Sequence, residues 1–235
     1  MYTVLAITCH PDDMEIFCAG TLMKCVDRGD RVVACHLCSG DLGHMVIPPA
    51  ELKQIRSLEA QKAAAIGGFE YRYGGFDDLR IYDNNKEARD RVVDIIREVD
   101  PDFIITHYPD DYMADHVATS KLVFEASFVA TVPHYETNVK KCARVVPIFY
   151  MSPSAGINFQ PTEYVDVTDY IDRKLDMLRC HESQLVWLKD HDNCDLVEEG
   201  RVQCRFRGSQ CGVKYAEGFT QCMVGGKIRA KRMLP

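Results

Sequence analysis

The sequence predicts an α/β fold, a Rossmann-like doubly wound and mostly parallel sheet flanked by helices. Over roughly residues 1–130, short apolar runs rich in β-formers alternate with stretches whose apolar residues recur at helical spacing. This alternation is typical of β-α-β units, whose strands lie parallel with right-handed crossovers. Polar clusters follow two of the apolar strands, at the sheet edge where such folds bind ligands.

In the first half of the chain, expected strands and helices follow one another. The strands are apolar runs that end in polar or glycine-containing loops, over 2–8, 31–37, 70–73 and 103–106. The helices carry one apolar face and stop at glycine, proline or loop residues, over 16–28, 50–66, 86–99 and 117–130. No Gly-x-Gly-x-x-Gly follows the first strand, so dinucleotide binding is not expected.

The C-terminal part, about residues 131–235, is less regular. Strands are expected over 146–150 and 163–167, a helix from Thr168 to about Leu188, and loops over the polar stretch 190–212. Because 235 residues suffice to bury one ordinary core, a single domain over residues 1–235 is expected.

The composition limits the classes of partner. Apolar residues make up 46% of the chain, the formal net charge is −7, and no basic stripe marks a nucleic-acid partner. No apolar run reaches the ~18 residues that cross a bilayer, and no secretory signal is visible, so a cytoplasmic protein without a membrane partner is expected. The 11 scattered cysteines indicate free thiols in a reducing compartment.

The run His10-Pro11-Asp12-Asp13-Met14-Glu15 follows the first strand, and Asp115-His116 ends a second cluster after the strand 103–106. A catalytic zinc site usually has three protein ligands and one open position. We assign His10, Asp13 and His116 as the ligands. Asp12 is then free to act as a base on water. Asp115 is expected beside His116, where it would orient an imidazole as a second catalytic residue.

Each cluster alone has an ordinary explanation, because Asp-Asp after proline is common turn chemistry and a lone histidine is often structural. Both clusters, however, follow strands of one predicted parallel sheet, which brings them to the same edge. The coincidence favours a metal-dependent hydrolase. Zinc is the expected cofactor, although a His-Asp-His site also accepts iron, cobalt or manganese.

These motifs resemble those of the LmbE-like (PIG-L) N-acetylglucosamine deacetylases. The first run resembles their His-Pro-Asp-Asp-x-Glu signature, and Asp115-His116 resembles the end of their His-x-Asp-His motif. The segments 56–60 and 215–219 resemble their Arg-x-x-Glu-Ala and Ala-Glu-x-Phe elements. The resemblance implies an LmbE-like fold, a zinc-dependent deacetylase for a small-molecule amino-sugar substrate, and a homo-oligomer, either a trimer or a hexamer.

The resemblance also implies substrate contacts, which we place at Arg56, Asp111, Tyr112 and Glu217. Alternatives stay open for two of them. Arg56 would otherwise form a surface ion pair with a nearby glutamate, Glu59 or Glu51. Glu217 would otherwise pair with a nearby cation, which is the favoured reading.

Two further features have two readings each. Trp187 is expected in the core, with a lid over the site as the alternative. The segment 39–44 is either part of the substrate rim or an ordinary turn.

One position departs from the family pattern. Met113 stands where the first histidine of His-x-Asp-His is usual, and a thioether cannot donate a hydrogen bond. His107 or Tyr112 would supply the missing donor, or zinc alone would polarise the carbonyl. Two rival functions follow: an amidase for another amide, such as a thiol conjugate, and a catalytically weak metal-binding homologue.

Overall fold

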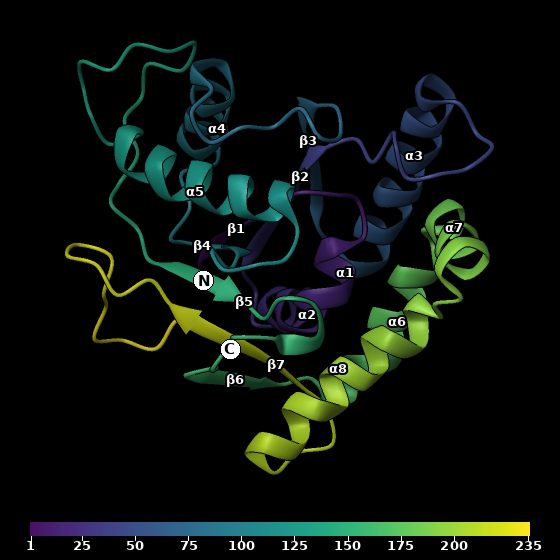
Figure 1. Ribbon diagram of the computed structural model, residues 1–235. Helices are drawn as coiled ribbons and strands as arrows, with labels where there is room; N and C mark the ends of the chain where they lie inside the picture. Colours follow the sequence, from purple (N-terminus) through teal and green to yellow (C-terminus); the bar gives the residue numbers. More distant parts are fainter.

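A seven-stranded sheet forms the centre of the computed structural model, which describes residues 1–235 (Figure 1). The strand order is β3-β2-β1-β4-β5-β7-β6. The bounds are β1 Thr3–Thr8, β2 Arg31–Cys38, β3 Glu70–Phe76, β4 Phe103–His107, β5 Ile148–Met151, β6 Glu163–Asp166 and β7 Ala216–Gln221. The predicted α/β fold with a mostly parallel sheet is confirmed.

The sheet reverses its winding direction at β1. β1 pairs in parallel with β2 on one side and with β4 on the other, and β3 and β5 extend the two halves, also in parallel. The loops after β1 and β4 therefore leave the sheet side by side, at the switch point where open α/β sheets bind ligands. Both polar clusters of the sequence lie in these loops and in the first turn of the helix that follows each loop.

Helices cover both faces of the sheet (Figure 1). They are α1 Asp13–Phe17, α2 Ala19–Asp27, α3 Pro49–Gly67, α4 Lys86–Val99, α5 Ala114–Val129, α6 Ile171–Arg179, α7 Glu182–Asp192 and α8 Leu196–Cys211, with 3-10 turns η1 Ser154–Gly156 and η2 Thr168–Tyr170. Along β1, Val4 and Ala6 pack toward α1, α2, α3 and α6, whereas Leu5 and Ile7 pack toward α4 and α5. Burial on both faces explains why this strand is continuously apolar.

The last two strands extend the same sheet. β7 lies antiparallel between β5 and β6. The strands expected over 146–150 and 163–167 are present as β5 and β6, but β7 was not predicted. None of the helices combines the length and the apolar character that crossing a bilayer requires. All 11 cysteines are free thiols, and seven of them are buried, as the sequence indicated.

The expectation of loops over 190–212 is wrong, because α8 occupies most of that stretch. The Asp195 side chain accepts a hydrogen bond from the Glu198 N–H at the start of α8, and Gly212 ends it in the left-handed region. The buried face of α8 includes Gly200 and Gly208, which lie close to neighbouring backbone or side chains. A face of this kind gives no apolar periodicity.

The expected helix from Thr168 to about Leu188 is also interrupted. α6 ends at Arg179 and α7 begins at Glu182, so two helices replace one. The break places His181 in the interior, where its side chain is fully buried. The break also lets α7 turn toward the loop that follows β2, which it meets through Gln184 near Gly43.

Candidate active site

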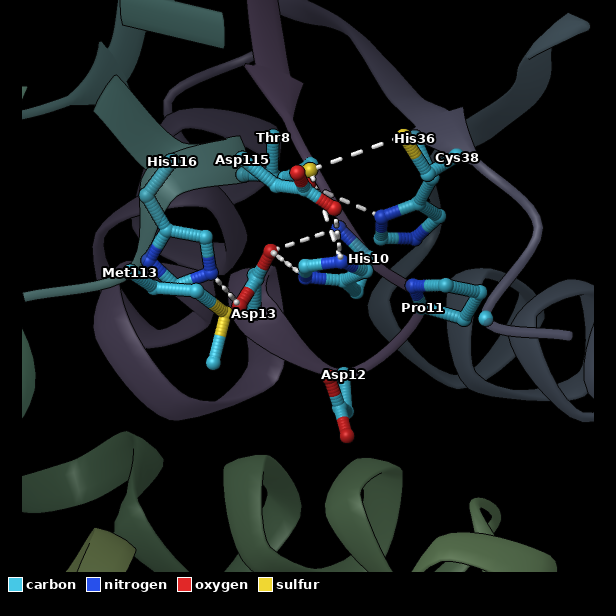
Figure 2. A network of polar contacts seen from close by, with 12 residues as sticks. Thr8, His10, Pro11, Asp12, Asp13, His36, Cys38, Met113, Asp115 and His116 are labelled. Carbon is cyan, nitrogen blue, oxygen red and sulfur yellow. Dashed lines mark hydrogen bonds and ion pairs between the residues drawn. The ribbon is translucent and has the colours of Figure 1, made fainter. Parts of the chain in front are cut away.

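The three predicted metal ligands meet where β1 and β4 end (Figure 2). His10 follows β1, Asp13 begins α1, and His116 lies in the first turn of α5. Their possible ligand atoms all lie within 4.8 Å of one another. Asp13 stands between the two imidazoles, with Oδ2 3.7 Å from His10 Nδ1 and Oδ1 3.2 Å from His116 Nε2.

The donor atoms of this cluster fit a divalent transition metal. His116 Nε2 is buried and makes no aligned hydrogen bond, although it faces Asp13. Burial disfavours a charged imidazole, but Asp13 and Asp111 outweigh it and raise the pKa of His116 to about 10. The same carboxylates favour a metal cation in place of that proton. The cluster is therefore a candidate metal site.

Asp111, expected to contact substrate, lies behind His116 instead. Its Oδ2 is 3.1 Å from His116 Nδ1, and its Oδ1 accepts a hydrogen bond from the Met113 N–H at 3.0 Å. The side chain is completely buried, so it does not reach the cavity. Asp111 thus holds the ring of a candidate ligand, a role that carboxylates commonly play around metal-bound histidines.

The expectation that Asp115 sits beside His116 is wrong. Asp115 Oδ2 is 3.4 Å from His10 Nε2 and accepts a hydrogen bond from the Leu79 N–H at 3.0 Å. Consecutive residues of a helix point about 100° apart, so the side chains of Asp115 and His116 diverge. Asp115 still contacts an imidazole, but that imidazole belongs to His10.

We expect Asp111→Asn to weaken zinc binding about 10–100-fold, because the charge that orients His116 is lost. The measurement is zinc affinity by chelator competition. Asp110→Asn is the matched control, since Asp110 is the adjacent aspartate and is exposed. Equal zinc affinity in the two variants would contradict the assignment of Asp111.

Asp12, the predicted base, is buried and stands apart from the ligand cluster (Figure 2). Its backbone has φ 111°, a strained conformation for a residue other than glycine. Burial raises the pKa of its carboxyl to about 6, while the positive charge of Arg56 acts in the opposite direction. Strain of this kind costs roughly 1–3 kcal/mol and is concentrated at functional sites.

Arg56 reaches from α3 across two loops. One of its terminal nitrogens, Nη2, donates to the carbonyl of Pro11 and lies 3.3 Å from Asp12 Oδ2, while Nη1 donates to the carbonyl of Gly40 at 3.0 Å. The alternative of a surface ion pair with a glutamate is wrong, because Arg56 is buried. Any side chain at Gly40 would collide with the guanidinium, and its φ of 72° also favours glycine.

A cavity of about 800 Å³ opens onto the cluster. Asp12, Asp13 and His116 form part of its floor, and Tyr112 stands at its mouth with 75% of its surface exposed. Leu42 and Gly43 also line the cavity, which favours the rim reading of the segment 39–44. Trp187 lines the cavity as well, so its expected place in the core is wrong.

His107 is poorly placed to replace the donor that Met113 lacks. It stacks on His116 with ring centroids 3.9 Å apart and does not line the cavity. Its Nε2 accepts a hydrogen bond from the Cys9 N–H at 2.9 Å, and burial lowers its pKa to about 4. Tyr112 and Met113 both line the cavity, and of these only Tyr112 can donate a hydrogen bond.

Glu217, expected to contact substrate, lies outside the cavity. It is buried on β7, where its carboxylate accepts hydrogen bonds from the N–H groups of Gly20 and Thr21 and pairs with Lys174. Glu217 therefore pairs with a nearby cation, which is the alternative given in the sequence analysis. These contacts correct its expected place among the substrate-binding residues.

Sequence reasoning missed Asp78 and the pairing of Glu15 with His181 in this region. Asp78 lines the cavity, accepts a hydrogen bond from the Gly40 N–H at 2.7 Å, and lies 3.9 Å from His10 Nε2. It follows β3, so the rule that polar residues after parallel strands meet at one edge could have found it. His181 and Glu15 form a buried pair, Nε2 to Oε2 3.4 Å, and no spacing in the sequence connects them.

Comparison with known proteins agrees with this geometry. Residues 5–127 match the family described as PIG-L, GlcNAc-PI de-N-acetylase. The chain belongs to the PIG-L family. The matched region contains the His10, Asp13 and His116 cluster together with Asp12 and Arg56.

Individual relatives show the range of activities in proteins of this fold. The chain is 29% identical to a diacetylchitobiose deacetylase of Thermococcus kodakarensis over 92% of this chain and 81% of that protein. The structure of an N,N'-diacetylchitobiose deacetylase of Pyrococcus horikoshii superposes with a TM-score of 0.78 at 26% identity, covering 94% and 83% of the two chains. A 4-carboxy-2-hydroxymuconate hydratase of Pseudomonas putida has the same fold, with a TM-score of 0.81 at 23% identity over both full chains.

Proposed function

We propose that this protein is a zinc-dependent deacetylase that removes an acetyl group from an N-acetylated amino sugar, a derivative of N-acetylglucosamine. The main support is the cluster of His10, Asp13 and His116, of which Asp13 and His116 are buried; it opens onto a cavity and leaves His116 Nε2 without an aligned partner. Two nitrogens and one carboxylate oxygen are the ligand types of a catalytic zinc site. Membership of the PIG-L family supports the same reaction.

In the proposed reaction, Asp12 takes a proton from the attacking water and returns it to the leaving amine. Arg56 keeps the Asp12 carboxylate in place while that proton moves. When held by His10, Asp13 and His116, zinc supplies Lewis acidity and lowers the pKa of water. The products are acetate and the free amino sugar.

The charge on the carbonyl oxygen needs a donor as the tetrahedral species forms. Tyr112 is our candidate for this role, because Met113 cannot donate and His107 is buried behind His116. The loss of one such donor typically costs ~10²–10³ in rate. A tyrosine at the cavity mouth would therefore compensate for the missing histidine.

The charges of the cavity argue against a hydratase for polycarboxylates. Four aspartates, Asp12, Asp13, Asp78 and Asp115, line the inner part of the cavity, where Arg56 is the one arginine. Arg56 is already bound to two carbonyls and to Asp12. With a divalent zinc ion bound, these four aspartates and Arg56 leave about one net negative charge, which disfavours a substrate with several carboxylates more than a neutral amide.

The test is acetate release from a panel of N-acetylglucosamine derivatives by the zinc-loaded protein. The panel also contains the amide of a thiol conjugate and an unsaturated polycarboxylate, whose hydration is followed by its ultraviolet absorbance. His116→Ala and chelator-treated protein are the controls.

Acetate release that disappears in both controls would support the proposal. Hydration without acetate release would overturn it. Hydrolysis of the thiol conjugate alone would show that the substrate is a different amide. No reaction despite stoichiometric zinc would indicate a metal-binding homologue and point to Met113 as the cause.

A further inference from the structure

The cavity continues from the ligand cluster to an apolar wall on the C-terminal helices. Of its 26 lining residues, 13 are hydrophobic. The wall is formed by Trp187 on α7 and by Leu196, Val202 and Phe206 on α8. The volume of about 800 Å³ is near the upper end of the ~300–1,000 Å³ of pockets that enclose drug-sized ligands.

This wall is partly open to solvent. Phe206 is 47% exposed and Val202 is 48% exposed, although both line the cavity. Trp187 is held in place by His191, whose ring stacks on the indole with centroids 4.3 Å apart. Covering such exposed apolar surface with an apolar ligand group lowers the free energy of the complex.

The charged residues near this wall restrict what covers it. Asp192 and Glu199 line the outer part of the cavity, and no lysine lines the cavity. An anionic group placed against α7 and α8 would face two carboxylates without a compensating cation. An uncharged group therefore fits the wall better than a phosphate or a carboxylate does.

We propose that the amide substrate carries an uncharged apolar group, an alkyl chain or an aromatic ring, that packs against the wall formed by Trp187, Leu196, Val202 and Phe206. This inference rests on the proposed function for the reacting end of the substrate. The apolar group belongs either to the aglycone of the amino sugar or to the acyl chain. The chemistry of the wall is the same for both sources.

The experiment uses two series of ligands and two readouts. One series is alkyl glycosides of N-acetylglucosamine with increasing chain length. The other is methyl glycosides with increasing N-acyl length. Binding to the zinc-loaded protein is followed by the fluorescence of Trp187, the one tryptophan of the chain, and release of the carboxylic acid is measured in parallel.

We expect affinity in one series to rise about fourfold for each methylene, which corresponds to ~0.8 kcal/mol per buried CH₂. The series that rises identifies the end that carries the group. An ω-carboxylate at the end of the chain should abolish the gain. Flat affinity in both series, or equal affinity of the carboxylate-terminated ligands, would overturn the inference.

Two variants distinguish the loss of wall contacts from a general loss of protein stability. Phe206→Ala should remove most of the dependence on chain length and leave the affinity for the shortest ligand within about twofold. Phe128→Ala is the matched control, because Phe128 is also exposed but lies outside the cavity. Equal loss of the chain-length dependence in both variants would count against the wall.

The two readouts distinguish the two proposals. Rising affinity without acid release would support the apolar site and refute the deacetylase. Acid release that is independent of chain length would support the deacetylase and refute the apolar site.

Discussion

Asp12→Asn should lower kcat by about 10²–10⁴-fold, the contribution typical of a general base, and leave zinc binding unchanged. Asparagine keeps the shape of the side chain and can still accept the hydrogen bond of Arg56, but it cannot take a proton from water. Asparagine also tolerates the positive φ of 111° found at this position better than most residues do. The fold of the loop should therefore survive the substitution.

The measurement is acetate release at saturating substrate together with the zinc content of the purified variant. Asp110→Asn serves as control, because Asp110 is exposed and does not line the cavity. Full turnover of Asp12→Asn with zinc bound would refute the role of Asp12. A loss of zinc in the variant would instead place Asp12 among the ligands.

The central part of the fold could be predicted because local pattern and global packing agree there. β1, β2 and β4 are buried on both faces, so each reads as a continuous apolar run. α4 shows a clear apolar face and is preceded by Asn85, whose side chain accepts hydrogen bonds from two backbone N–H groups. Such signals are local in the sequence, and they need no knowledge of distant partners.

The C-terminal part could not be predicted as well, because its packing depends on distant partners. The buried face of α8 contains Gly200, Gly208 and Arg207, and the Arg207 guanidinium bonds to Ser152 on the far side of a loop. β7 is recognisable only through its pairing with β5 and β6, which lie some 50 to 70 residues earlier in the chain. Neither contact leaves a periodic pattern in the sequence.

The candidate ligands were placed correctly at one edge because each follows a strand of the sheet. Their supporting residues were harder to assign, because nothing local shows that Asp111 reaches His116 while Asp115 turns to His10. Arg56 is buried for a similar reason, since its partners belong to loops 16 and 45 residues away.

Lys174→Met should destabilise the fold by about 3–5 kcal/mol, the usual cost of leaving a buried charge without its partner. Lys174 on α6 is completely buried and pairs with Glu217 on β7, which also accepts hydrogen bonds from the N–H groups of Gly20 and Thr21 in α2. The pair therefore connects three elements of one core. Urea denaturation at pH 7 measures the effect.

The double variant Lys174→Met with Glu217→Gln distinguishes charge from packing. Glutamine keeps an oxygen for the N–H groups of α2 but carries no charge, so the double variant should recover at least half of the lost stability. Lys189→Met is the control, because Lys189 is exposed on α7 and should change stability by less than about 0.5 kcal/mol. A loss below about 1 kcal/mol in Lys174→Met would contradict this expectation, because it would show that the interior accommodates the unpaired Glu217.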